Sequence, residues 1–316
     1  MTELLTFGGI SGIPSETKIY LENALSQNTR RAYRNDLTDF LAWGGSIPSS
    51  PEAIVTYLTG KAGVLSLANL RRRLVSISKA HTMQGYSDPV KTDLVKLTMR
   101  GISRIHGKPQ GQVAPILKED LTVMLSRIPD TTRGKRDRAL LLLGFCAALR
   151  RSELVAVNLE DIEFNSQGIV LTLPRSKTDQ QGEGRKIAIP RGKGRICPVA
   201  IIHDWKVHLS ANSSPVHLTA LSGALFRSVG KGGVISEQRL SDRAVADIIK
   251  HYASECGLDP QRYSGHSLRA GLATSAAQHG VSSWKIRAQT GHKSDAMLAR
   301  YIRDGDLFSD NAAALF

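Results

Sequence analysis

Apolar residues in the first third of the chain recur at helical spacing, and each run carries its own start and stop signals. The stretch SQNTRRAYRNDLTDFLAWGG has apolar side chains three and four residues apart and ends at a pair of glycines. In SPEAIVTYLTG, Ser50 is a typical N-cap and Pro51 fits the first helical position. The stretches SLANLRRRLVSISKAHTMQG and DPVKTDLVKLTMRGISRIHG follow the same pattern, and the second starts at Asp88 and Pro89. This part of the sequence predicts a bundle of four or five helices.

A break in this pattern separates the bundle from the rest of the chain. GKPQGQVAP, residues 107–115, contains glycines and prolines but no large apolar side chain except Val113, which is typical of a linker. Two helical runs follow, LKEDLTVMLSRIP and KRDRALLLLGFCAAL. GIVLTLPRSKTDQQGEGRKIAIP then alternates with period two around a polar turn, which predicts a β-hairpin. From Pro198 to the end the pattern is helical again.

These elements predict a mainly α protein with a small β-hairpin or sheet. We expect residues 1–108 to form a helical domain, residues 109–115 a linker, and residues 116–316 a second domain of mixed α/β structure. A chain of 316 residues is long enough for two such domains, each with its own core.

The charge of the chain points to a polyanion as its partner. Lys and Arg total 42 against 28 Asp and Glu, so the formal net charge is +14. Both domains share the excess, with 14 basic and 8 acidic residues up to Gln110 and 28 and 20 beyond it. Nucleic acid gripped from two sides fits this distribution, whereas a disordered basic tail would concentrate its charge in one run. We find no basic amphipathic helix with an aromatic-rich face for an acidic membrane.

The cysteines and the apolar runs indicate in which cellular compartment the protein is expected. Cys146, Cys197 and Cys256 are widely separated and lack metal-ligand spacing, so reduced thiols are expected. No signal peptide is apparent, and the longest apolar run, ALLLLGFCAAL, is too short to span a bilayer. We therefore expect a soluble cytoplasmic protein, associated with the nucleoid if DNA is its partner, and no membrane partner.

The stretch GHSLRAG places a histidine and an arginine on one face of a predicted helix. His266 and Arg269 are neighbours on that face because they are three residues apart. Gly265 is expected to let the chain turn tightly into the helix, whose first unpaired N–H groups favour an anion. A phosphate would suit this arrangement. The alternative is that His266 caps the helix and Arg269 forms a salt bridge with a carboxylate.

Further candidate residues follow the same chemistry, although each has an ordinary structural explanation. In ALRRSEL an apolar helix ends at Arg150, and Glu153 lies three residues on, which could be a plain ion pair. Lys177 lies on the predicted hairpin, where a flexible cation could reach into a cleft. His292 follows a glycine in TGHKSD, and Tyr301, nine residues later, could be half-buried packing.

Basic residues on the first-domain helices are candidates for contacts with a DNA backbone. The alternative is a plain solvated face. These residues are Arg30, Arg31, Arg34, Arg71, Arg72, Arg73 and Lys79.

Taken together, these residues resemble the tyrosine recombinases, or phage integrase family. They follow one another in the order Arg, Lys, His, Arg, His and Tyr, and they lie in ALRRSEL, the hairpin, HSLRAG, TGHKS and ARYIR. The resemblance covers the whole chain: it implies that residues 1–108 are a core-binding domain and 116–316 the catalytic domain. It also implies a site-specific recombinase that integrates or exchanges DNA through a 3′-phosphotyrosine and a Holliday junction. Its partners would be a double-stranded recombination site and a homotetramer of two synapsed dimers, with the tail after Tyr301 docked on a neighbour.

The resemblance also implies a role for each catalytic residue. Tyr301 would be the nucleophile, and Arg150 and Arg269 would clamp the phosphate, since a guanidinium binds two oxygens at once. His266 would accept the phenolic proton and His292 would donate a hydrogen bond.

Three further roles complete this set. Lys177 would protonate the leaving 5′ oxygen, since an ammonium carries a transferable proton. Glu153 would orient Arg150 or His266, and Arg243 would contact a base. Because the arginines supply the electrostatic stabilisation and no acidic cluster is apparent, we expect no metal, no ATP and no other cofactor.

Two alternatives use the same residues differently. A type IB topoisomerase would reseal the strand that it cut. A DNA-binding regulator could have kept the fold and lost the reaction, although a complete set of six residues argues against such decay.

Overall fold

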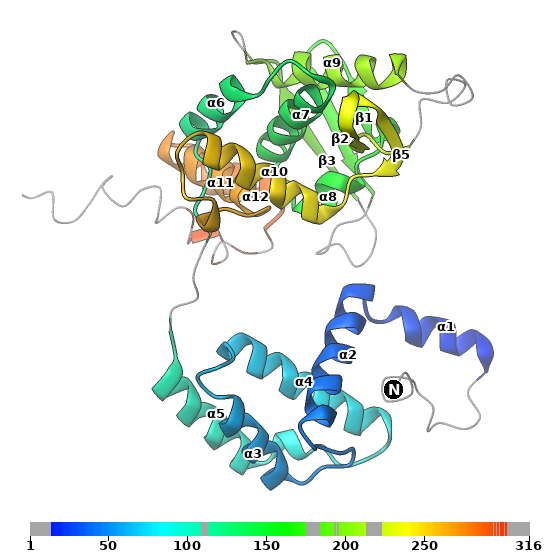
Figure 1. The fold of residues 1–316 in the computed structure, drawn as a ribbon, viewed down its shortest axis with the longest axis vertical. Helices are drawn as coiled ribbons and strands as arrows, with labels where there is room; N and C mark the ends of the chain where they lie inside the picture. Colours follow the sequence, from blue (N-terminus) through cyan, green and yellow to red (C-terminus); the bar gives the residue numbers. More distant parts are fainter. Residues whose placement is uncertain are drawn as a thin grey trace, which may run out of the picture. The chain divides into compact units, whose positions relative to one another are not determined.

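The structure is a computed structural model that describes residues 14–108, 113–174, 184–192, 194, 196–212, 223–292, 294, 296, 298–299 and 301. It divides into two compact units, Met1–Gln110 and Gly111–Phe316. The described part of the first unit is helical (Figure 1). Its helices are α1 (Ser15–Asn23), α2 (Gln27–Ala42), α3 (Pro51–Lys61), α4 (Leu67–Met83) and α5 (Asp93–His106), with a 3-10 turn at Pro89–Lys91.

Serine caps begin three of these helices, and the cap at Ser50 was predicted from the sequence. The hydroxyls of Ser26, Ser50 and Ser66 accept hydrogen bonds from the backbone N–H three residues on, at 3.2, 3.3 and 3.3 Å. Each cap satisfies an N–H that the helix leaves unpaired. The prediction for the last helix is wrong at its start: Asp88 caps the 3-10 turn, and α5 begins only at Asp93.

Ion pairs and a small apolar core hold the first unit together. Phe40, Tyr57, Leu70 and Ile77 are buried at the centre of its core. The buried carboxylate of Asp36 accepts hydrogen bonds from Arg72 Nε and Nη2 at 2.9 and 2.8 Å and from Ser76. Asp39 pairs with Arg73 and Lys61 and accepts from the Tyr57 hydroxyl. These contacts fasten α2 to α3 and α4.

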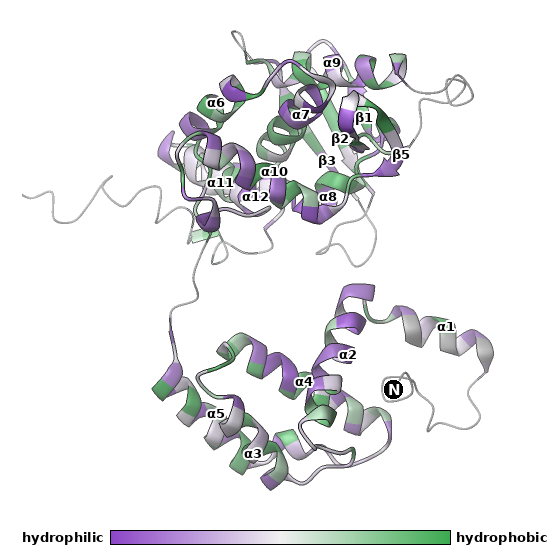
Figure 2. Cartoon of the chain, viewed as in Figure 1, coloured by the Kyte–Doolittle hydropathy of each residue, from purple (hydrophilic) through white to green (hydrophobic). Residues whose placement is uncertain are grey.

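Helices and two small sheets make up the described part of the second unit (Figure 1). Helix α7 changes from hydrophilic in its basic first turns to hydrophobic along its second half (Figure 2), and that half is buried in the unit's main core. The helices are α6 (Lys118–Arg127), α7 (Thr132–Cys146), α8 (Arg151–Ala156), α9 (Pro198–Ala211), α10 (Asp242–Glu255), α11 (Ser267–Gln278) and α12 (Ser283–Thr290). Across the described ranges, no helix combines the length and the apolar character needed to span a membrane.

The predicted hairpin is confirmed and is part of a three-stranded antiparallel sheet. Strand β2 (Gly168–Leu173) pairs with β1 (Ile162–Phe164) and with β3 (Arg185–Pro190). Ile169 lies opposite Ile189 and Leu171 opposite Ile187, and all four side chains are buried. One face of the hairpin therefore packs into the core.

A second sheet was not predicted. Strands β4 (Arg227–Val229) and β5 (Ile235–Arg239) are antiparallel, so the expectation of helix from Pro198 onward is wrong in this segment. Most of β5 is exposed, and β4 has three residues. A strand this short and this exposed has no alternating apolar pattern to reveal it.

The chain that enters the second unit is tied to α11. Ala114 N donates to Arg262 O at 2.7 Å, and Ile116 N donates to Ser267 O at 3.0 Å. A Cβ on Gly271 would lie 1.8 Å from Ile116 O, so only glycine permits this approach. Residues 114–116 therefore belong structurally to the second unit, and they fix the first turns of α11.

Candidate active site

A strained turn after α7 delivers Arg150 to the site. Ala148 adopts a left-handed conformation with φ of 49°, which turns the chain sharply between α7 and α8. Arg150 is the N-cap residue of α8, and its backbone N donates to Glu153 Oε2 at 3.0 Å. Its Nη1 donates to Glu153 Oε1 at 2.5 Å. Both side chains are largely buried, so Glu153 fixes the orientation of Arg150.

Helix α11 carries the second arginine. Arg269 is buried, and its Nη1 donates to the carbonyl oxygen of Ala148 at 2.8 Å. Its buried Nη2 has no hydrogen-bond partner among the described residues. Burial, with the nearby charge of Arg150, lowers the pKa of Arg269 to about 10, so it stays charged at neutral pH. The predicted alternative of a salt bridge from Arg269 to a carboxylate does not occur within this part of the chain.

His266 occupies the N-cap position of the same helix. Its side chain is exposed and makes no capping hydrogen bond in the described helix. The explanation of His266 as a cap therefore fails. The role expected for Gly265 also differs: its φ is not positive, but an added Cβ would lie 2.8 Å from Cβ of Arg151. The Cβ of Arg151 moves only with its backbone, so glycine is needed for this close packing.

His292 and Tyr301 bring the end of the described chain to this site. Gly291 ends α12 in a left-handed conformation, and His292 follows it, buried. The His292 and Tyr301 rings lie with centroids 5.7 Å apart. Tyr301 also packs against the small cluster of Ala273, Ile286 and Leu298. Tyr301 therefore packs as a half-buried residue and also lies at the candidate site.

Thr290 determines which nitrogen of His292 carries the proton. Thr290 Oγ1 lies 2.7 Å from both the carbonyl oxygen of Ile286 and His292 Nδ1. The hydroxyl proton goes to the carbonyl, which can only accept, so Nδ1–H donates to Thr290 Oγ1. In the neutral ring Nε2 is then an acceptor. Burial, with the charges of Arg269, Arg150 and Arg185, lowers the pKa of His292 to about 4.

This pKa predicts how stability depends on pH. An unfolded histidine protonates near pH 6.5 and folded His292 only near pH 4, so the unfolded state binds more protons in between. The free energy of unfolding should therefore fall on acidification from pH 6.5 to 4, approaching about 1 kcal/mol per pH unit from this one group. Urea titrations at several pH values should show a shallower fall for His292→Gln. Equal slopes for the two proteins would contradict a depressed pKa.

Arg185 joins this cluster, although it was not among the residues predicted from the sequence. It opens β3, and its charge lowers the pKa of both Arg269 and His292. A signal was present: alternation along RKIAIP puts Arg185 on the same face as the buried Ile187 and Ile189. Burying a charged side chain on the core face of a strand is costly, so its presence there indicates a partner or a ligand.

The described site is strongly cationic. Three guanidinium groups, those of Arg150, Arg185 and Arg269, interact electrostatically there, and Glu153 is the carboxylate that pairs with one of them. Buried charges are costly unless they are paired. The excess of positive charge therefore makes this a site for an anion. No group of His, Cys, Asp and Glu in the described ranges is arranged to hold a metal ion.

Two predicted features lie outside the described residues. Lys177 falls in the gap at 175–183, and the tail after Tyr301 falls in 302–316. Their roles stay predictions.

The basic residues of the first unit separate into two groups. Arg72 and Arg73 pair with Asp36 and Asp39 inside the unit, so a structural role accounts for these two. The side chains of Arg31, Arg34 and Arg71 are exposed, and Arg30 is half-buried.

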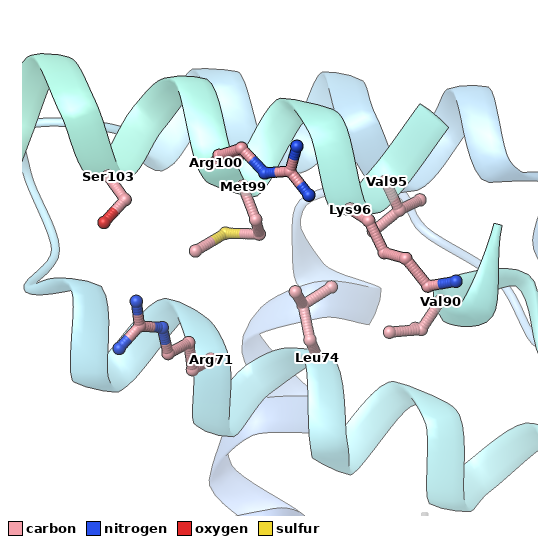
Figure 3. Close-up of a pocket in the computed structure, with 8 residues that line it drawn as sticks. All are labelled: Arg71, Leu74, Val90, Val95, Lys96, Met99, Arg100 and Ser103. Carbon is pink, nitrogen blue, oxygen red and sulfur yellow. The ribbon is translucent and has the colours of Figure 1, made fainter. Parts of the chain in front are cut away.

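A pocket between α4 and α5 lies beside one of these exposed residues. It has a volume of about 380 Å³, with Leu74, Val95 and Met99 on its apolar floor (Figure 3). Cations from both helices surround it: Arg71, Lys96 and Arg100. This face of the first unit is therefore basic at its rim and apolar at its centre.

Arg243 lies in the first turn of α10. Ser241 caps that helix, with its hydroxyl accepting from Ala244 N at 3.2 Å. The Arg243 side chain is exposed. The Arg243 guanidinium can therefore extend from the surface of the unit, while the capped start of α10 fixes the position of its backbone.

Comparisons with known proteins agree with this arrangement. Residues 116–306 match the phage integrase family. An integrase/recombinase xerD homolog of Selenomonas ruminantium is 38% identical over 307 residues, covering 94% of this chain and 87% of that protein. Tyrosine recombinase XerD of Xanthomonas axonopodis pv. citri is 27% identical over 286 residues, covering 88% and 87% of the two chains.

Solved structures show the same fold. The XerH site-specific recombinase in a post-cleavage complex with a palindromic difH substrate has a TM-score of 0.68 at 15% identity, covering 95% of this chain and 83% of that one. A lambda integrase dimer bound to a COC′ core site has a TM-score of 0.62 at 17% identity, covering 94% and 77%. With five of the predicted site residues, Arg150, Glu153, Arg269, His292 and Tyr301, gathered in one buried cationic cluster, the chain belongs to the phage integrase, or tyrosine recombinase, family.

Proposed function

We propose that this chain is a site-specific DNA recombinase that cuts and rejoins strands through a covalent bond from Tyr301 to a 3′ phosphate. The observation that carries the proposal is the cluster of guanidinium groups close to the Tyr301 ring, in which Arg269 Nη2 has no hydrogen-bond partner among the residues that the structure describes. A phosphodiester would supply the missing anion. The relatives named as recombinases support the same activity.

The cleavage step uses these groups in a fixed order. Tyr301 Oη attacks the phosphorus while His266 accepts its proton. Arg150 and Arg269 stabilise the negative charge that builds on the non-bridging oxygens. The bond to the 5′ oxygen then breaks, and Lys177 donates a proton to that oxygen. The products are a 3′-phosphotyrosine and a free 5′ hydroxyl.

Two groups prepare the site for this step. Glu153 holds Arg150 in place through the ion pair between them. His292 has a low pKa before DNA binds, and an anionic phosphate nearby would raise it, since an opposite charge favours the protonated form. Protonation would make Nε2 a donor, so His292 hydrogen-bonds the phosphate as the imidazolium.

Rejoining needs no external energy source, because the phosphotyrosine keeps the energy of the broken bond. A 5′ hydroxyl from a second duplex attacks the phosphorus and releases Tyr301. Exchange of one strand pair at a time leads through a Holliday junction in a homotetramer. The structures of relatives bound to DNA sites, and the lambda integrase dimer among them, support assembly on DNA.

Strand exchange between two marked duplexes tests the proposal. The DNA site is first selected from a random pool by binding to the full chain. Exchange of flanking sequences is the expected result. Relaxation of supercoils without exchange would identify a type IB topoisomerase activity instead, and the absence of any covalent adduct on nicked suicide substrates would identify a DNA-binding regulator.

Arg243 is proposed to read a base. Its segment, RLSDRAVADIIKHYASECG, is similar to a stretch of Cre recombinase in which an arginine contacts guanine, and His292 stands where Cre has Trp. An arginine at a helix start can reach O6 and N7 of guanine in the major groove. Arg243→Ala should lose about 1–3 kcal/mol of binding at one base position and leave non-specific affinity nearly unchanged.

Binding to a set of single-base variants of the selected site measures this effect. Equal weakening on all sequences, together with a shallower salt dependence, would make Arg243 a phosphate contact instead.

A further inference from the structure

Arg185 is held at the site as firmly as the two predicted arginines. Its Nη1 donates to the backbone carbonyl of Gln289 at 3.1 Å. The side chain of Gln289 in turn donates to Cys146 O at 2.7 Å and to Ala188 O at 3.2 Å. The end of α12, the end of α7 and strand β3 thus form one connected support for this guanidinium.

The chain before His292 is shaped around the same side chain. A Cβ on Gly291 would lie 2.3 Å from Arg185 Nη1. Glycine suits this position because of its positive φ of 68°, and a side chain there would displace the guanidinium from its present place. This arrangement places Arg185 directly beside the turn that presents His292.

Arg185 has two further side-chain nitrogens besides Nη1. Nε and Nη2 are buried and have no hydrogen-bond partner among the described residues. Burial lowers the pKa of Arg185; the charge of Glu153 raises it, and that of Arg150 lowers it again. A buried guanidinium beside two others, with two donors unused, destabilises the DNA-free protein unless an anion binds there.

We propose that Arg185 is a further phosphate-binding residue of the reaction, which donates Nε–H and Nη2–H to the scissile phosphate beside Arg150 and Arg269. This inference rests on the proposed function. It adds a third guanidinium to the two that the order of motifs along the chain predicts. The ligand chemistry is a phosphodiester whose non-bridging oxygens accept these donors.

Arg185→Met tests the role, with Lys186→Met as the matched control. Lys186 is the next residue on β3 and points to the exposed face, so its replacement removes the same charge from the other side of the strand. We expect Arg185→Met to form the covalent adduct about 10²–10³-fold more slowly at saturating DNA, the usual effect of losing one oxyanion donor. Lys186→Met should react at the unmutated rate.

Two further measurements separate phosphate binding from a structural role. Without DNA, Arg185→Met should have an equal or higher midpoint of thermal unfolding, because an unpaired buried charge is removed. On a substrate with a methylphosphonate at the scissile position, one charged oxygen is gone, so the rate ratio between the unmutated protein and Arg185→Met should shrink towards one. Arg185→Lys keeps the charge and should recover part of the rate on the ordinary phosphate.

The opposite results would overturn the inference. One such result is a lower midpoint of thermal unfolding for Arg185→Met together with the same loss of rate on the phosphate and the methylphosphonate substrates. Another is an Arg185→Lys variant as slow as Arg185→Met on both substrates. A third is an Arg185→Met variant that reacts at the unmutated rate. Failure of the unmutated protein to form any adduct would instead refute the proposed function itself.

Discussion

Tyr301→Phe is expected to abolish the covalent protein–DNA adduct and to leave DNA binding nearly intact. The substitution removes only the hydroxyl, which is the nucleophile of the proposed reaction. The ring keeps its packing against Ala273, Ile286 and Leu298. Adduct formation on a nicked suicide substrate, followed on a denaturing gel, measures the effect.

Tyr263→Phe is the control for this experiment. Tyr263 is buried in the same unit and belongs to its main core, so the variant loses the same hydroxyl from a ring that has no part in the proposed reaction. It should form the adduct at the unmutated rate. A Tyr301→Phe protein that still forms a detergent-resistant adduct would remove Tyr301 from the mechanism.

Lys177→Ala is expected to bind DNA but to cleave it about 10²–10⁴-fold more slowly, the usual effect of removing a general acid. The loss alone does not identify the cause, because the same change removes a positive charge near the phosphate. A substrate with sulfur at the bridging 5′ position separates the two causes. A thiolate leaves without a proton, since a thiol is far more acidic than an alcohol. The defect of a missing general acid should therefore disappear on this substrate.

Arg150→Ala is the control for the sulfur substrate. Its proposed partners are the non-bridging oxygens, so sulfur at the bridge should not restore its rate. If Lys177→Ala also stays slow with sulfur, Lys177 is not the acid, and His266 or His292 must deliver the proton.

Local signals made the helices of the first unit predictable. The serine caps of α2, α3 and α4 act through hydrogen bonds that span three residues, so the sequence contains them directly. The same reasoning placed one boundary too early, because Asp88 and Pro89 also suit the 3-10 turn that precedes α5. The β4–β5 sheet had no comparable signal, since most of its second strand is exposed.

The candidate site was predictable as a set of residues. The order of Arg150, Lys177, His266, Arg269, His292 and Tyr301 along the chain was enough to identify the family and to name these positions as candidates. The convergence of Arg150, Arg269 and His292 depends on packing, because they come from the start of α8, the first turn of α11 and the chain just after α12. Arg269 reaches Ala148 across 121 positions of sequence, which no local pattern encodes.

The sequence by itself determined the helical content, the hairpin, the basic character and the catalytic candidates. The first three depend on residue type or on neighbours within a few positions, and the catalytic candidates depend on the order of short motifs along the chain. Only the tertiary structure decided which cations are available to a ligand. Arg72 and Arg73 pair with carboxylates 36 and 34 residues away, whereas half-buried Arg185 has two buried donors without a partner in the described part of the chain. A charge becomes structural or functional according to the partner that folding brings to it, and that partner lies far away in the sequence.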